Sequence, residues 1–155
     1  MFTPILKRQL EAFDISGFEI SGHVDLRCSP FEEDFSTIGS FTVRFSMYGC
    51  SQSLDTVTGM STDLASVPRE VWSIIPPHRK IKRPAVFHDY LYQYRPAVTV
   101  PADGVRSIGR NEADALLYHA CKSEGMSDEN CFLVYQAVRI GGRSVWHAHD
   151  AEFHK

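Results

Sequence analysis

The sequence predicts an α+β fold, in which a small antiparallel sheet from the N-terminal half packs against about three helices from the C-terminal half. Two changes along the chain support this. Apolar side chains recur at every second position in parts of residues 17–60, and at helical spacing from residue 66 onward. The chain has 155 residues, of which 43% are hydrophobic and 23% charged, as in an ordinary single domain. We expect one domain over 1–155, with strands mainly in 1–60, helices mainly in 66–142 and a polar tail at 143–155.

The strand predictions rest on the segments FEISGHVDL and GSFTVRFSMY and a shorter segment near LDTVTGM. In FTVRFSMY the residues Phe41, Val43, Phe45 and Met47 alternate with more polar positions, which is typical of a strand with one buried face. Gly and Ser clusters and the acidic segment SPFEEDFS separate these runs as turns or loops. The first dozen residues are compatible with either a short helix or an extended arm.

Two helices are expected next. Ser66 is a suitable N-cap for a short helix over VPREVWSII, which the pair Pro76–Pro77 ends. Pro84 suits an early position of a helix that runs through AVFHDYLYQY and stops before Pro96. The following stretch, PAVTVPADGVRSIG, contains two prolines and two glycines and is predicted as a loop.

The remaining helices have recognisable ends. Asn111 is a plausible N-cap for the helix NEADALLYHACKSEG, which Gly125 stops. Asp128 is expected to cap a last helix through CFLVYQAVRI, closed by Gly141–Gly142.

Composition narrows the function classes. The net charge of −3 gives no electrostatic reason to expect a nucleic acid partner, and no apolar stretch approaches the length of a transmembrane helix. The N-terminal segment is too mixed in polarity for a signal peptide, so we expect a soluble intracellular protein. The four cysteines include no C-x-x-C pair, and free buried thiols are favoured over two disulfides.

The strongest chemical candidate is the pair His88–Asp89 with Tyr92 in AVFHDYLY. His88 and Tyr92 are four residues apart and project from one helix face, whereas Asp89 is rotated by about 100°. A histidine base gains from a second carboxylate that fixes its tautomer and stabilises the imidazolium. Asp114, near the start of the next long helix, can fill that role if the two helices pack antiparallel.

A structural interpretation of the same residues stays open. Asp114 lies three residues after Asn111, where an acid supports a helix N-terminus. His88 and Tyr92 are equally compatible with a satisfied core histidine and an ordinary packing residue. Adjacent His and Asp on a buried helix nevertheless favour a functional set.

Asp63, in MSTDLASVPR, is either a turn-forming residue or a further oxygen ligand to a cation held with Asp89. The cation would be calcium, magnesium or zinc. The other histidines are weaker candidates. His119 is expected on the exposed side of its helix, and the pair His147 and His149 in the tail can bind a transition metal adventitiously.

The segments STDLASVPREVWSIIPP, KRPAVFHDYLYQY and RNEADALLYHACKSEG resemble an uncharacterised protein family of tailed bacteriophages and prophages. Its members share a T-D-x-A-S-x-P segment, an H-D-x-L-Y helix and a later helix that contains A-D. The resemblance covers about residues 58–142 and carries no assigned activity. It implies a phage protein in the host cell cytoplasm or the virion, with other phage or host proteins as partners.

A looser resemblance is to the secreted phospholipase core, in which an H-D-x-x-Y helix packs against a second helix that bears an aspartate. It implies that His88 activates water, Asp89 binds calcium, and Asp114 supports His88 with the help of Tyr92. The Gly-rich calcium loop of that fold has no counterpart, because IIPPHRKIKRPAV contains no glycine.

Two main functions are therefore expected from the sequence. One is a metal-assisted hydrolase of an ester, phospholipid or cell-envelope bond, with His88, Asp114 and Tyr92 in catalysis and Asp89 and Asp63 at the metal. The other is a non-catalytic virion, tail or assembly component, or an inhibitor of a host protein, in which the His–Asp network is structural. The hydrolase requires that His88, Asp89 and Asp114 line one solvent-reachable pocket.

Overall fold

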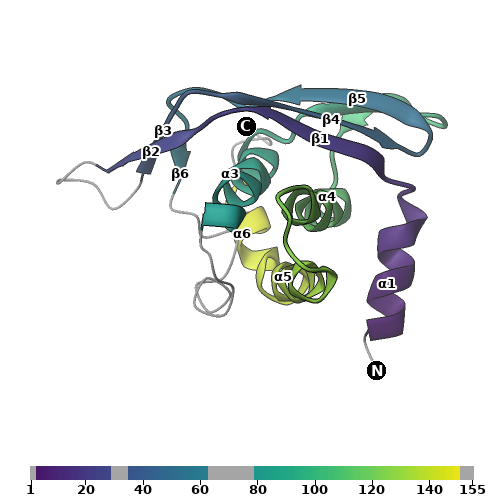
Figure 1. The fold of residues 1–155 in the computed structure, drawn as a ribbon. Helices are drawn as coiled ribbons and strands as arrows, with labels where there is room; N and C mark the ends of the chain where they lie inside the picture. Colours follow the sequence, from purple (N-terminus) through teal and green to yellow (C-terminus); the bar gives the residue numbers. More distant parts are fainter. Residues whose placement is uncertain (1–2, 29–34, 63–78, 151–155) are drawn as a thin grey trace.

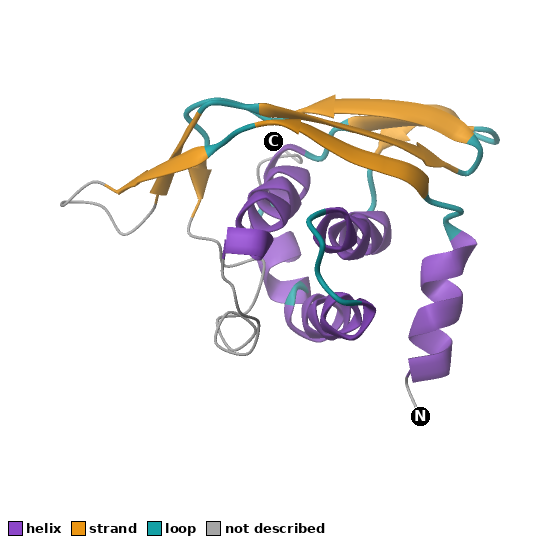
Figure 2. Ribbon diagram, in the orientation of Figure 1, coloured by secondary structure: helices purple, strands orange, loops and turns teal. Residues whose placement is uncertain are grey.

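The structure is a computed structural model that describes residues 3–28, 35–62 and 79–150. Antiparallel strands form a layer on one side of the molecule, and a group of helices lies against the inner face of this layer (Figures 1 and 2). The strands come mainly from the N-terminal half and most helices from the C-terminal half. The predicted α+β fold is therefore confirmed.

Most of the layer consists of two three-stranded antiparallel sheets. The first has the order β1-β4-β5 and the second the order β2-β3-β6. Their bounds are β1 (Ser16–Gly22), β2 (Asp25–Cys28), β3 (Phe35–Ile38), β4 (Phe41–Met47), β5 (Cys50–Asp55) and β6 (Ser61–Thr62). The predicted strand FEISGHVDL is thus interrupted between β1 and β2.

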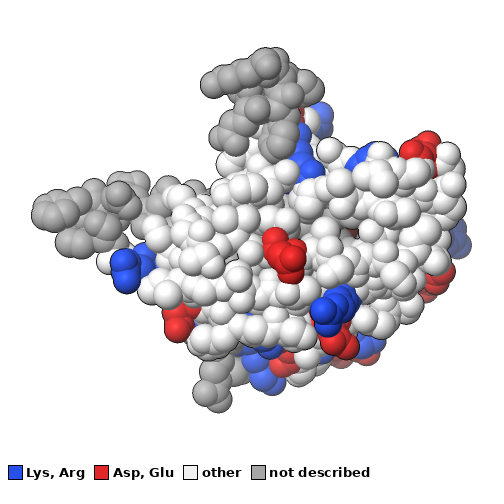
Figure 3. Space-filling model, turned by 90° about the horizontal axis from the view of Figure 1, so that it is seen from above, with Lys and Arg blue, Asp and Glu red and all other residues white. Residues whose placement is uncertain are grey.

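Strand β4 lies at the centre of the first sheet and supplies much of the core. Its alternate residues Phe41, Val43, Phe45 and Met47 are all buried, as the sequence pattern predicts. The opposite face of this sheet carries hydroxyl-bearing residues such as Ser46 on β4, and the view from above shows few charged side chains among the described residues (Figure 3). One face of the layer therefore packs on the helices and the other is polar with little charge.

The segment predicted as a loop after residue 95 is instead a β-hairpin. Strands β7 (Ala97–Val100) and β8 (Gly104–Ser107) pair antiparallel. Pro101 begins the connecting turn and Gly104 is the first residue of β8, while Val98 and Val100 alternate into the core. The side-chain amide of Gln52 on β5 accepts from Thr99 N at 3.0 Å and donates to Thr99 O at 2.7 Å. This side chain attaches the hairpin to the main sheet.

The described residues contain five helices, α1 (Thr3–Ala12), α3 (Arg79–Tyr94), α4 (Arg110–Ser123), α5 (Asp128–Gly141) and α6 (Arg143–Ala148). Helix α1 settles the open question about the N-terminal residues, and α6 orders part of the predicted polar tail. The short helix predicted over VPREVWSII lies outside the described residues. Helix α3 begins five residues before Pro84, so this proline lies inside the helix rather than at its start.

Two predicted helix caps are wrong by one or two positions. The N-cap of α4 is Gly109 rather than Asn111, because the Glu112 carboxylate accepts from Gly109 N at 2.9 Å and closes the first turn. The N-cap of α5 is Ser127, whose hydroxyl accepts from a backbone N–H of the first turn, so that Asp128 is the first helical residue. Both corrections follow from local hydrogen bonds that several neighbouring residues could have made.

Helices α3 and α4 pack antiparallel beneath the sheet. Arg83, early in α3, forms an ion pair with Glu124 at the end of α4, while residues later in α3 meet the start of α4. Apolar side chains of both helices, among them Phe87, Leu91 and Leu116, join the β4 residues in the main core. This packing fixes the helix pair on which the candidate site is built.

Two further predictions concern the chain as a whole. Cys50, Cys121 and Cys131 are free thiols, of which Cys121 and Cys131 are buried, whereas Cys28 is exposed. None of the described helices is long and apolar enough to cross a membrane.

Candidate functional site

Helix α3 directs His88 and Tyr92 at the same partner on α4. His88 Nε2 lies 2.7 Å from Asp114 Oδ1, and the Tyr92 hydroxyl donates to the same oxygen at 2.6 Å. The two rings contact each other, with their centroids 4.3 Å apart. The three residues that the sequence assigns to one site are therefore together, since the four-residue spacing places His88 and Tyr92 one helical turn apart.

The hydrogen bonds determine which atom of each pair carries the proton. Burial, followed by the charge of Asp114, raises the pKa of Tyr92, so its hydroxyl keeps its proton and donates. The Asp114 carboxylate then acts as an acceptor, and the 2.7 Å contact requires a proton on His88 Nε2. In the neutral ring this tautomer leaves the lone pair on Nδ1.

Two arginines that sequence reasoning missed hold the other side of Asp114. Arg139 on α5 donates to Asp114 Oδ2 at 2.7 Å, and Arg110 lies 3.7 Å from the same oxygen. Arg110 also donates to the carbonyls of Val138 and Arg139 near the end of α5. The i,i+4 spacing of Arg110 and Asp114 was a usable signal. Arg139 is 25 residues from Asp114 and had none.

One atom of this network stands out by its lack of a hydrogen bond in the part of the chain that the structure describes. Among the described residues, His88 Nδ1 is the single buried side-chain nitrogen or oxygen without a hydrogen bond. The His88 side chain has no exposed surface. Leaving a buried acceptor unpaired costs about 1–3 kcal/mol, and local strain, a catalytic role or a bound water or ion can each account for such a group in a native protein. This nitrogen is the most specific chemical feature of the site.

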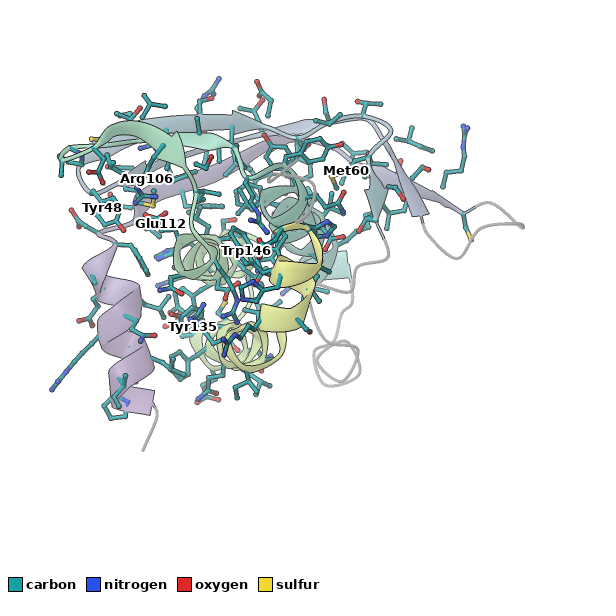
Figure 4. The ribbon with its side chains drawn as sticks, turned by 180° about the vertical axis from the view of Figure 1, so that it is seen from behind. Tyr48, Met60, Arg106, Glu112, Tyr135 and Trp146 are labelled. Carbon is teal, nitrogen blue, oxygen red and sulfur yellow. The ribbon has the colours of Figure 1, made fainter. Side chains whose placement is uncertain are left out.

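The end of α5 and helix α6 hold the Tyr92 side chain in place. A Cβ atom at Gly142 would lie 2.6 Å from both the Tyr92 hydroxyl and the Val138 carbonyl, so only glycine fits here. The Trp146 ring packs edge-on against Tyr92 with a centroid distance of 5.0 Å, and it lies on the inner side of α6 (Figure 4). The predicted polar tail thus contributes directly to the site.

Asp89 points to a different neighbour, as its rotation on the helix predicts. It is buried, and one of its oxygens accepts a hydrogen bond from the Thr62 hydroxyl on β6. Asp63, the second predicted metal ligand, lies outside the described residues. Within residues 3–28, 35–62 and 79–150, no three His, Cys, Asp or Glu side chains are grouped to hold a metal ion. The cation therefore remains a prediction that depends on Asp63.

The site is closed in this structure. His88 and Asp114 have no exposed surface, and Asp89 is 3% exposed. The sequence predicts that these three residues line one solvent-reachable pocket. His88 contacts Asp114 and precedes Asp89 on α3, but the three do not reach solvent here. Any reaction at His88 therefore requires an opening motion.

A second buried carboxylate lies nearby on the same helix. Glu112 accepts from Arg106 Nη2 at 2.6 Å and from the Tyr48 hydroxyl at 2.8 Å, and all three side chains meet where α4 approaches the sheet (Figure 4). Burial alone raises the pKa of Glu112, but the hydrogen bonds from Arg106, Gly109 and Tyr48 outweigh it and lower the pKa. Burial also raises the pKa of Tyr48 to about 12. This network was not predicted.

The other histidines differ from their predicted positions. His119 is half-buried rather than exposed, and its ring stacks near Phe18 at 6.5 Å between centroids. Burial lowers the pKa of His119 to about 4. In the tail, His147 Nδ1 contacts Asp150 at 2.8 Å, so this imidazole has a carboxylate partner.

Comparison with known proteins places the chain in a family. A family model described as "Protein of unknown function (DUF1353)" matches residues 33–138. The chain belongs to this family. The matched region of the DUF1353 protein contains His88, Asp89, Tyr92 and Asp114, and it ends one residue before Arg139. No curated protein and no solved structure matches the chain.

Proposed function

We propose that this DUF1353 protein is a phage-encoded, metal-assisted hydrolase in which His88 is the general base. The observation that carries the proposal is a buried His88 whose Nε2 is bonded to Asp114 and whose Nδ1 has no hydrogen-bond partner in the described part of the chain. An Asp–His pair of this kind fixes the imidazole tautomer and stabilises the imidazolium that forms during proton transfer. The substrate class is an ester, phospholipid or cell-envelope bond.

The proposed reaction uses the free nitrogen directly. His88 Nδ1 takes a proton from water while the water oxygen attacks the carbonyl or phosphoryl centre of the substrate. The imidazolium, held through Nε2 by Asp114, then returns this proton to the leaving alkoxide as the bond to it breaks. Tyr92 and Arg139 keep Asp114 oriented toward His88 throughout.

The proposal assigns a divalent cation to Asp89 and Asp63. Such a cation, calcium, magnesium or zinc, would supply charge stabilisation for the developing oxyanion. In support, Asp89 is a buried carboxylate one residue from His88, and its Thr62 partner immediately precedes Asp63 in the chain. Asp89→Asn should therefore abolish any dependence of the activity on the cation.

A second candidate function follows from the burial of the site. Because His88 and Asp114 have no exposed surface, the network can instead lock α3, α4 and α5 together in a non-catalytic phage component or host-protein inhibitor. In that case the cost of the unpaired Nδ1 is offset by the other hydrogen bonds of the network. A virion component would be present in purified particles at fixed copy number.

Activity and stability measured on the same variants separate the two. Wild-type protein is assayed on p-nitrophenyl butyrate, phosphatidylglycerol vesicles and purified peptidoglycan, each with Ca²⁺, Mg²⁺ or Zn²⁺. His88→Gln keeps an N–H for Asp114 but has no titratable nitrogen, so the hydrolase should lose activity at least about 100-fold while its melting temperature changes little. His88→Ala, which has no side-chain N–H to donate to Asp114, is the comparison variant.

Two outcomes would contradict the hydrolase. One is a wild-type protein that is inactive on every probe with every cation, and the other is a His88→Gln variant that retains the wild-type rate. Unfolding of the domain by His88→Ala, together with either outcome, would support the structural function.

A further inference from the structure

A separate cleft of about 710 Å³ lies between α1 and the helices α4 and α5. Helix α1 leads into β1 and stands beside α5 (Figure 1). Side chains of both helices line the cleft. The volume of the cleft falls in the range of small-molecule sites. The residues of the Asp114 network do not line it. The cleft therefore needs its own explanation.

The cleft wall already holds an ammonium group on an aromatic ring. Lys7 Nζ of α1 lies 5.8 Å from the centroid of the Phe132 ring on α5, within the usual range of a cation–π contact. Tyr118 supplies a second aromatic ring to the lining, and Leu10 supplies an apolar side chain. The aromatic and apolar surfaces thus suit an organic cation with a hydrocarbon part.

Charges on both walls favour a ligand with more than one positive group. Glu11 and Asp14 line the α1 side, while Asp128 and Glu129 line the α5 side. Asp128 is paired with Lys122 at 3.6 Å. Lys7 and Lys122 are the two lysines of the lining, so its four carboxylates exceed its two ammonium groups.

His119 makes the cleft more favourable for a cation. Its ring lines the cleft and packs against Phe18 and Tyr118. Burial lowers the pKa of His119 to about 4, so the ring is neutral at physiological pH and adds no repulsion. A neutral imidazole also carries a lone pair that can accept a hydrogen bond from an N–H group.

We propose that this cleft binds a linear polyamine, with its methylene groups along Phe132 and Leu10 and its ammonium groups at the carboxylates of the two walls. In this arrangement Lys7 occupies the Phe132 ring in the free protein and is displaced when the polyamine binds. The proposal is independent of the hydrolase, since His88 takes no part in it.

The experiment is a titration of the full chain with spermidine at about 0.15 M salt, where distant charges are largely screened. Binding is measured by calorimetry and by amide chemical shifts. Shifts are expected in α1, α4 and the start of α5. The double variant Glu11→Gln/Asp14→Asn should weaken binding about tenfold, as expected for two partly screened ion pairs. Lys7→Met should tighten binding about threefold or more, because it removes the internal competitor.

Matched variants test whether charge alone is responsible. Glu19→Gln/Asp103→Asn removes two carboxylates outside the cleft, and Arg8→Gln removes a cation from the same helix without touching the lining. Both should bind spermidine like the wild type. Equal effects in the test and control variants, shifts located elsewhere, or no binding would overturn the proposal. So would a penta-lysine peptide that binds more tightly than spermidine, which would indicate a protein partner.

Discussion

Two buried carboxylates on α4, Glu112 and Asp114, lie only two residues apart and accept similar hydrogen bonds. They differ in the reactive groups that their partners still offer. Glu112 accepts from Arg106, Tyr48 and the Gly109 N–H, and Asp114 accepts from Arg139, Tyr92 and His88. Each carboxylate thus accepts from an arginine, a tyrosine and a third donor, and Asp114 has a second arginine, Arg110, at 3.7 Å. Among the hydrogen-bond donors, only the third differs in kind.

This difference separates a structural network from a candidate site. A backbone N–H has no other function once it is bonded, so the Glu112 network is complete. An imidazole that donates through Nε2 keeps a second nitrogen, and in His88 this Nδ1 is buried with no partner among residues 3–28, 35–62 and 79–150. The two networks teach that a buried carboxylate with arginine and tyrosine partners is not by itself a sign of catalysis. The unsatisfied nitrogen of His88 is the feature on which the hydrolase proposal rests.

The largest expected difference between the two networks is the loss of stability when each carboxylate is replaced by its neutral amide. Asp114→Asn should destabilise the domain by about 3–5 kcal/mol, because it leaves the charge of a largely buried arginine without its carboxylate. The Arg139 side chain is 17% exposed, whereas that of Arg106 is 35% exposed and can be hydrated. Glu112→Gln should therefore cost clearly less. Urea unfolding of both variants checks this, and an equal or larger cost for Glu112→Gln would contradict it.

The two networks also differ in how tightly a glycine is packed against them. Gly142→Ala places a Cβ 2.6 Å from the Tyr92 hydroxyl and the Val138 carbonyl, so we expect a loss of about 2–3 kcal/mol from overpacking. Gly109→Ala places its Cβ 3.4 Å from Glu112 Oε1 and should cost no more than about 1 kcal/mol. Thermal unfolding gives both values. A Gly142→Ala variant as stable as wild type would show that Tyr92 is not fixed by α6.

Removing one hydroxyl from each network is a finer test. Tyr92→Phe deletes the 2.6 Å hydrogen bond to Asp114 and should cost about 1.5–3 kcal/mol, the usual value for a buried bond to a charged group. Tyr48 is only half-buried, so water can replace its hydroxyl and Tyr48→Phe should cost less than about 1 kcal/mol. If the hydrolase proposal holds, Tyr92→Phe should also lower the rate while Tyr48→Phe leaves it unchanged. Equal costs and rates for the two variants would remove the distinction between the networks.

The sequence predicted the parts of this comparison that depend on local spacing. The four-residue interval from His88 to Tyr92 and the alternation along β4 each require only one element, and both are confirmed. The β7–β8 hairpin was missed because its prolines and glycines are as common in irregular loops. Arg139 was missed for a different reason, since its contact with Asp114 depends on how α5 packs against α4.

His119 provides the smallest test, because it is an imidazole on α4 without a carboxylate partner among the described residues. Its pKa is about 4 in the folded protein because of burial and about 6.5 when unfolded. Between these values the unfolded chain binds more protons, so stability should fall as the pH decreases from about 6.5 toward 4. Because the ring stays partly exposed, we expect only about 1 kcal/mol. The difference in unfolding free energy between wild type and His119→Gln, measured from pH 7 to 4.5, isolates this contribution. A pH-independent difference would show that the His119 ring is hydrated in the folded protein, which would also weaken the case for a neutral imidazole in the cleft.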